Sequence, residues 1–379
     1  MIKILDRYLL RQFFQAFVIC FVSLTGLYIV FDAFTNLEEF LRCAEKGGGL
    51  FSLMGSHYAY QSIVFFDRTA GLLTLVAAMF TVSWIQRHNE LTALLSAGIS
   101  RIRVVMPVIV AAIGIALLSA ASRELIIPRF RDELARRPQD LVGDVGQSLQ
   151  PKYDHRTDVL IRGKFTYGDQ QRIEKPNFLM PPTLWSYGEQ LVAKNAFYRP
   201  PRTNRPGGYL LDEVEQPDHL EERPSLRLDD EPVVITPHDA PDWLKPNQCF
   251  VVSDVDFEQL TGGRAFRQFS STAQLISSLR NPSLDFGADV RVAIHTRIVN
   301  PLLDVTLLFL GLPLVVSRHS RNVFLAIGMC VGVVTVFLLV VVGFQHLGAI
   351  YLLEPALAAW APLMVFVPPA VGLAESMWQ

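Results

Sequence analysis

The residues best suited to chemistry lie in a short polar connection between two apolar stretches. Residues 86–100 read QRHNELTALLSAGIS. Arg87 and Glu90 come first, and the leucines that follow recur at helical spacing, which makes one apolar stripe of Leu91, Leu94 and Leu95. The pattern predicts a short amphipathic helix at about residues 87–97. An acidic residue beside an apolar stripe suits recognition of another protein better than catalysis.

The ends of this helix are also marked in the sequence. Gly98 suits the left-handed position that ends a helix, and Ser100 suits the cap that begins the next one. Two interpretations stay open. The helix rests on lipid headgroups, or it is a coupling helix that docks into a groove on a separate ATPase subunit.

Motifs for catalysis are missing from the chain. It contains no G-x-x-x-x-G-K-[ST], H-E-x-x-H or G-x-S-x-G. The sequence therefore predicts a non-catalytic subunit without a bound cofactor or metal. Four cysteines show no metal spacing, and pairing of Cys43 with Cys249 stays open. A net charge of −2 gives no reason to expect nucleic acid as a partner.

The elements that position this connection are apolar runs at both ends of the chain. Each is about the length that crosses a bilayer, and they cover residues 9–31, 58–85, 104–121, 298–316, 323–344 and 356–374. Asp67 and Arg68 are expected to mark an interfacial end of the second run. Asp304 is expected to be the main ionisable residue within the spans, and its role is left open.

The middle of the 379-residue chain has a different character. Short β-prone stretches separated by turn residues predict an all-β sandwich or open barrel, at 159–167, 190–198, 209–214, 232–236 and 249–255. Residues 216–246 are expected to form a long loop, and Ser271–Leu279 a short amphipathic helix. The expected division is 1–124 for three spans, 125–290 for the β domain, and 291–379 for three more spans.

Basic residues in the short connections predict the orientation. Those on one side are Lys3, Arg7, Arg11, Arg87, Arg101, Arg103, Arg318 and Arg321. The opposite connections hold Arg42 and Lys46 among several glutamates. Both termini are therefore expected in the cytoplasm, with the β domain outside.

Three motifs together resemble the LptF/LptG family of lipopolysaccharide export permeases. They are LDRYLLRQF at residues 5–13, RHNELTALLSAGISRIRVVMP at 87–107, and HTRIVNPL at 295–302 followed by GLPL at 311–314. The resemblance implies six transmembrane helices with a periplasmic β-jellyroll between the third and fourth. It also implies a bacterial inner-membrane location and the following partners: an LptB-like ATPase dimer that uses ATP, a second LptF/LptG-type permease, LptC/LptA-like periplasmic proteins and lipopolysaccharide. The sequence does not separate LptF from LptG.

Roles for particular residues follow from the same resemblance. Glu90 and Arg87 would contact the ATPase, while Leu91 and Leu94 would pack into its groove. Spans one and five would form the lateral entrance for lipid, and the expected cavity residues are Phe31, Phe34, Arg42 and an aromatic side chain at position 338, which is Leu338, next to Phe337. In place of the basic residues frequent at the outer end of span one, residues 32–39 are acidic.

Two other functions stay open beside lipopolysaccharide export. The chain could be the permease of another envelope glycolipid or of a lipoprotein. It could also be a structural envelope protein that transports nothing.

Overall fold

Six membrane-length helices dominate the computed structural model, which describes residues 4–46, 49–136, 146–168, 170–202, 205–228, 231–284, 287–316 and 323–375. They are α1 (Ile4–Thr35), α3 (Leu50–Arg87), α5 (Arg101–Ala121), α9 (Ala288–Val316), α10 (Val323–Ala349) and α11 (Pro355–Glu375). Their apolar composition follows from the bilayer, where a helix satisfies its backbone hydrogen bonds internally. The six expected spans are confirmed. Lys3, Arg318 and Arg321, which entered the orientation, lie outside the described residues.

Short helices join these spans in the first half of the chain. They are α2 (Leu37–Lys46), α4 (Glu90–Ser96), a π-helix η1 (Ser122–Ile126), a 3₁₀ helix η2 (Ile127–Phe130) and α6 (Arg131–Ala135). Only α4 was expected from the sequence. The π-helix directly continues α5, and π-turns of this kind occur often at functional positions.

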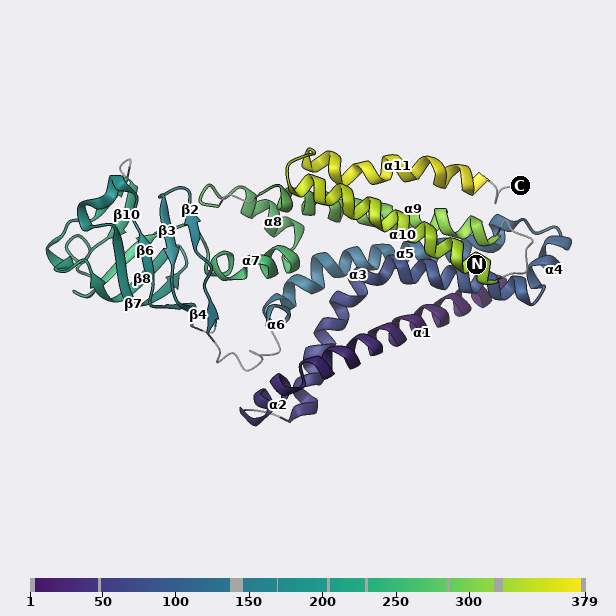
Figure 1. Cartoon of the computed structure of the whole chain (residues 1–379), viewed down its shortest axis with the longest axis horizontal. Helices are drawn as coiled ribbons and strands as arrows, with labels where there is room; N and C mark the ends of the chain where they lie inside the picture. Colours follow the sequence, from purple (N-terminus) through teal and green to yellow (C-terminus); the bar gives the residue numbers. More distant parts are fainter. Residues whose placement is uncertain are drawn as a thin grey trace. The chain divides into compact units, whose positions relative to one another are not determined.

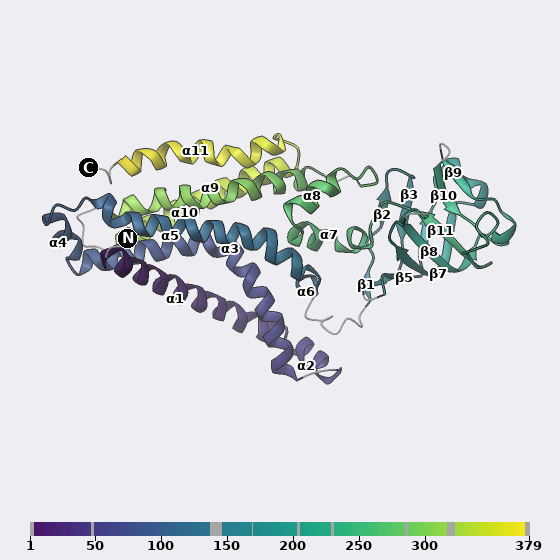
Figure 2. The same ribbon diagram turned by 180° about the vertical axis from the view of Figure 1, so that it is seen from behind.

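The chain folds as two compact units. The membrane unit combines Met1–Leu37, Gly55–Phe130 and Phe286–Gln379, and the β unit combines Glu38–Met54 with Arg131–Asp285. In the membrane unit α9 packs against α5, α10 and α11 (Figures 1 and 2). One apolar core joins α1, α3, α5, α9, α10 and α11, so spans before and after the β unit share it. The expected boundaries at residues 124 and 290 stay predictions.

An antiparallel sheet of eleven strands forms the centre of the described β unit. The strands are β1 (Gln147–Ser148), β2 (Lys152–Asp154), β3 (Val159–Arg162), β4 (Phe165–Tyr167), β5 (Arg172–Glu174), β6 (Asn177–Leu179), β7 (Gln190–Arg199), β8 (Gly208–Gln216), β9 (Leu226–Leu228), β10 (Glu231–Ile235) and β11 (Gln248–Val252). The main path runs β1-β4-β5-β7-β8-β11-β10-β9, and β6 links β7 to β3 and β2. The expected all-β region is confirmed.

The sheet is held by residues that alternate along its strands. Tyr209 is fully buried, and its ring lies 5.9 Å from Phe178 and 5.4 Å from Tyr198. Its hydroxyl donates to the carbonyl of Val255 at 2.8 Å. The buried aromatic rings therefore fix β6, β7 and β8 against the segment that leaves β11.

The expectation of a long loop at residues 216–246 was wrong. This segment holds β9, β10 and a short 3₁₀ helix η5 (Leu220–Glu222). Leu244, with partly buried Ile235, then packs on Phe250 of β11 and covers one face of the sheet. The expected helix at Ser271–Leu279 is present as α8 (Thr272–Leu279), with Ser271 as its cap, and it follows α7 (Phe257–Phe269).

Candidate functional site

The helix α4 is short and sharply bounded. Its first residue, Glu90, follows Asn89, which adopts a left-handed conformation with φ of 58°. At the other end Gly98 has φ of 80°, and the amides of Gly98 and Ile99 donate to the carbonyls of Leu95 and Leu94 at 3.0 and 3.1 Å. This pair of hydrogen bonds is the Schellman arrangement that ends a helix at glycine. The expected left-handed role of Gly98 is confirmed.

The leucine stripe of α4 packs against the chain's own spans. Leu91 is 8% exposed and shares a small core with Leu9 of α1, Ile85 of α3 and Val104 of α5. Leu94 is partly buried against the same core. These two leucines therefore anchor α4 to the first three spans.

Polar contacts fix the same region around Glu90. The Tyr8 hydroxyl lies 3.2 and 3.1 Å from the two carboxylate oxygens of Glu90 and donates to that carboxylate. Arg103 of α5 donates to Asp6 of α1 at 3.0 Å. Glu90 is thus held in place by α1, and one of its carboxylate edges is already occupied within the chain.

The opposite side of α4 is open to solvent in the isolated chain. Its exposed residues include Arg87 and His88 just before the helix, and Thr92, Ala93 and Ser96 within it. Small and polar residues at these positions leave a shallow surface beside one basic group. Such a surface can receive a protein partner without burying a large unpaired charge.

A second polar site lies among the spans themselves. Arg123 of η1 donates from Nε to both carboxylate oxygens of Asp67 in α3, at 3.0 Å each. Its Nη1 donates at 2.8 Å to the side-chain oxygen of Asn300 in α9, whose amide nitrogen donates to the carbonyl of Thr296. The Ser119 hydroxyl lies 3.2 Å from Asp67 as well. One guanidinium therefore connects α3, the end of α5 and α9.

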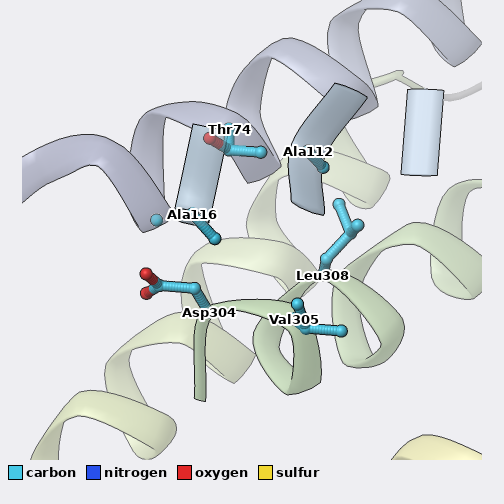
Figure 3. A pocket seen from close by; sticks show the side chains of 7 residues that line it. Thr74, Ala112, Ala116, Asp304, Val305 and Leu308 are labelled. Carbon is cyan, nitrogen blue, oxygen red and sulfur yellow. The ribbon is translucent and has the colours of Figure 1, made fainter. Parts of the chain in front are cut away.

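Asp304 lies one helical turn beyond Asn300 and faces a small cavity (Figure 3). Thr74 and Gly71 of α3 line the cavity with Ala112 and Ala116 of α5. A Cβ atom on Gly71 would lie only 2.0 Å from Oδ1 of Asp304, so glycine is required for this close approach. The carboxylate makes no direct hydrogen bond to another residue that the structure describes.

The structure adds a charged pair to the expectation about Asp304, while the interfacial position expected for Asp67 stays a prediction. Asp67 lies within α3, which begins at Leu50, and its side chain is only 10% exposed. Asp304 is also accompanied by the Asp67–Arg123 pair. The sequence signal for this pair was a carboxylate inside one apolar run and a guanidinium just after the next run.

The comparison with protein families decides what kind of protein carries these sites. The family described as "Lipopolysaccharide export system permease LptF/LptG" matches residues 7–164 and 244–375, well over half of the chain. The chain belongs to the LptF/LptG family. A comparison with curated proteins finds no match. As an LptF/LptG protein, the chain is a multi-pass inner-membrane protein of the lipopolysaccharide export machinery, with the role of a permease.

The expected cavity residues of this LptF/LptG protein are not among the residues that form the two polar sites. Phe31 and Phe34 are 66% and 76% exposed near the end of α1. Arg42 lies on α2, exposed, with its guanidinium 3.8 Å from Glu38. The aromatic side chain expected at position 338 was wrong: Leu338 is exposed, whereas Phe337 is buried with its ring 4.8 Å from Phe366.

The cysteine pairing left open by the sequence does not occur in the structure. Cys249 is a buried free thiol in β11, and burial raises the pKa of this thiol above its usual range. A thiol that stays protonated and covered is a poor partner for disulfide exchange. The β unit of this LptF/LptG protein is therefore held by packing and hydrogen bonds at this position.

Proposed function

We propose that this permease is one half of an ATP-driven exporter and that α4 is the coupling helix on which a separate LptB-like ATPase dimer acts. Family membership supports lipopolysaccharide as the cargo. The observation that carries the proposal is the packing of Leu91 against Leu9, Ile85 and Val104. Because α4 is tied to α1, α3 and α5 at once, movement of α4 is passed to all three spans.

The roles within α4 divide between its two faces. Leu91 and Leu94 hold the helix to the spans, in place of the contact with the ATPase groove that the resemblance implied. Arg87 and Glu90 stand at the start of the helix beside the exposed surface of Thr92, Ala93 and Ser96. We assign contact with the ATPase to this exposed side and to the carboxylate of Glu90.

The rest of the assembly follows from the family. A second LptF/LptG-type permease completes the cavity, for which Phe31, Phe34 and Arg42 remain candidate lining residues. Lipopolysaccharide leaves the inner membrane and passes to LptC/LptA-like proteins on the side of the β unit. The positive-inside distribution of Lys and Arg supports cytoplasmic termini and an extracytoplasmic β unit. ATP is bound and hydrolysed by the partner subunit, and this chain serves as a non-catalytic component.

The test compares three variants of the purified complex. Glu90→Ala removes the carboxylate, and Glu90→Gln keeps an acceptor for Tyr8 but removes the charge. Tyr8→Phe keeps the Glu90 carboxylate and removes the hydroxyl that donates to it, together with the 2.8 Å hydrogen bond that this hydroxyl accepts from Gln12. A hydrogen bond to a charged group contributes about 1.5–3 kcal/mol, so its loss should weaken the interaction between this chain and the ATPase by roughly tenfold or more. We expect both Glu90 variants to lower lipopolysaccharide transferred per ATP hydrolysed by about that factor.

The Tyr8→Phe variant is the control for an internal role. It should keep transport close to that of the unmodified complex, and all three variants should keep the same thermal midpoint. Normal export by Glu90→Gln would refute the charge contact, and equal loss in Tyr8→Phe would reassign Glu90 to holding α1. Mass spectrometry of the lipid that copurifies with the complex separates lipopolysaccharide from another glycolipid or a lipoprotein. Purification without any ATPase would favour a structural envelope protein.

A further inference from the structure

Three arginines lie at the end of β7 and between β7 and β8. Arg199 is the last residue of β7, and Arg202 and Arg205 precede β8. The amide of Arg202 donates to the carbonyl of Arg205 at 2.8 Å, and the amide of Arg205 donates back at 3.0 Å. Residues that exchange both hydrogen bonds in an antiparallel pair stand opposite each other, so their side chains leave from the same face. Arg199, Arg202 and Arg205 are called the arginine turn below.

The guanidinium of Arg205 packs against a pair of aromatic rings. Its central carbon lies 5.5 Å from the ring centre of Trp243 and 5.4 Å from that of Phe250, and the two ring centres are 5.4 Å apart. Phe250 is fully buried in β11, which ties this arrangement to the sheet. Both rings therefore lie on one side of the guanidinium, and cation–π contacts of this kind leave its other side for a ligand.

The Nε atom of Arg205 is buried and has no hydrogen-bond partner within the described residues. Arg199 of β7 stands opposite Gly208 of β8, which in turn stands opposite Val252 of β11. Directly opposite residues share a face of the sheet, and so do Val252 and Phe250, which lie two positions apart in β11. Arg199 therefore stands on the same face of the sheet as Phe250. The three basic groups therefore converge on one side of the sheet.

No carboxylate of the described chain forms an ion pair with the arginine turn. The acids Glu231 and Asp254 are each bound to Arg156, at 3.1 Å. Burial lowers the pKa of Arg205, and the positive charges of Arg202 and Arg199 lower it further. Such mutual repulsion is relieved when an anion binds between the groups.

We propose that the arginine turn, with Trp243 beside it, is a binding site for the phosphate group of a lipid headgroup. Guanidinium groups bind phosphate through paired N–H···O contacts, and an arginine fixed in advance loses little entropy on binding. Trp243 is 40% exposed and presents an apolar ring next to the charges. A headgroup that carries a phosphate on a sugar or glycerol offers a matching apolar part.

The side chains of the site lie outside the matched segments of the family model. The match ends at residue 164 and resumes at residue 244, so Arg199, Arg202, Arg205 and Trp243 all fall between the two segments. The family match therefore does not assign a role to these four residues. Binding of phosphate here does not require the proposed coupling through α4.

The experiment uses the full chain in dodecyl maltoside micelles, which contain no phosphate. Phosphorus NMR line broadening measures binding of glucosamine 1-phosphate and of glycerol 1-phosphate, and competition by unphosphorylated glucosamine gives the contribution of the sugar. We expect Arg202→Gln and Arg205→Gln each to raise the dissociation constant for the phosphates about tenfold. Arg227→Gln, at an exposed position of β9, makes the same charge change away from the turn and should have no effect.

Fold controls keep the test independent of stability. Circular dichroism and the thermal midpoint report whether Arg205→Gln disturbs the sheet, and the exposed positions Arg199 and Arg202 carry the test if it does. Tighter binding of glucosamine 1-phosphate supports a glycolipid headgroup, and tighter binding of glycerol 1-phosphate supports a phospholipid. The site is overturned if the substitutions at Arg199, Arg202 and Arg205 leave phosphate binding unchanged, or if Arg227→Gln weakens it equally. It is also overturned if the phosphates bind no more tightly than plain glucosamine.

Discussion

The pair of Asp67 and Arg123 offers the most demanding test of the fold. Arg123→Met keeps most of the side-chain volume and removes the guanidinium. The change breaks two contacts of 3.0 Å to Asp67 and one of 2.8 Å to Asn300. It leaves a carboxylate that is 10% exposed among apolar helices without its cation.

The size of the effect depends on which of two opposing tendencies prevails. Breaking a buried ion pair costs about 3–5 kcal/mol in soluble proteins, because one charge stays buried and unpaired. Polar contacts in membrane proteins average only about 0.6 kcal/mol, because the unfolded chain in the membrane finds other partners. Here a full charge is stranded, so the first tendency prevails, and we expect Arg123→Met to lose about 3 kcal/mol of unfolding free energy.

The double variant Asp67→Asn/Arg123→Met removes the stranded charge. It should therefore be more stable than Arg123→Met alone, with an interaction energy of about 2 kcal/mol in the double-mutant cycle. Unfolding by sodium dodecyl sulfate in mixed micelles, followed by circular dichroism, gives the four free energies. Arg129→Met, at an exposed position close by, should stay within about 0.5 kcal/mol of the unmodified chain. Strict additivity of the two changes would refute the buried pair.

Three further outcomes are expected. Gly71→Ala should destabilise the chain by about 1–3 kcal/mol in the same assay, because its new carbon meets Oδ1 of Asp304 at 2.0 Å, and Asp304→Ala should restore most of the loss. Gly98→Ala should destabilise α4 by about 1–2 kcal/mol, because a φ of 80° is unfavourable for alanine. Hydrogen exchange of the α4 amides should therefore become faster, and unchanged exchange would contradict this expectation. Hydrogen bonds from His238 and from the Ser225 amide lower the pKa of Asp239 from 3.8 to about 2. The ionised carboxylate therefore contributes its full stabilisation above pH 3.8, and this stabilisation is lost as the pH falls through about 2. Hydrogen exchange of the Ser225 amide should become faster over this pH range, and this change should be absent in Asp239→Asn.

The spans were predictable because the bilayer imposes one simple requirement, a long apolar helix. The longest strand was predictable for a related reason, since buried and less buried residues alternate along most of the ten positions of β7. Strands of two or three residues, such as β1, β5 and β9, carry too few positions for alternation to show. Within 159–167, the break between β3 and β4 falls at Gly163, where an added Cβ would lie 2.3 Å from Ile173.

The candidate sites were predictable only in part. The stripe of Leu91 and Leu94 was identified, but periodicity states that a face is buried and not what buries it. Only the fold shows that Leu9 and Val104 cover it. The link from Asp67 to Arg123 spans 56 positions in the chain, so no local pattern could join them. The arginine turn was missed because the sheet pairing that brings Trp243 to Arg205 is set by distant strands.

The contacts of α9 bear on how the two halves of the chain stay together. Asn300, in the middle of α9, accepts from Arg123, and next to the last residue of α9 the carbonyl of Val315 accepts from Gln86 of α3 at 2.9 Å. The spans before and after the β unit are thus joined by hydrogen bonds at two separate levels of one helix, in addition to the apolar core that they share. None of these contacts involves residues 131–285, so two coexpressed fragments split within that stretch are expected to copurify.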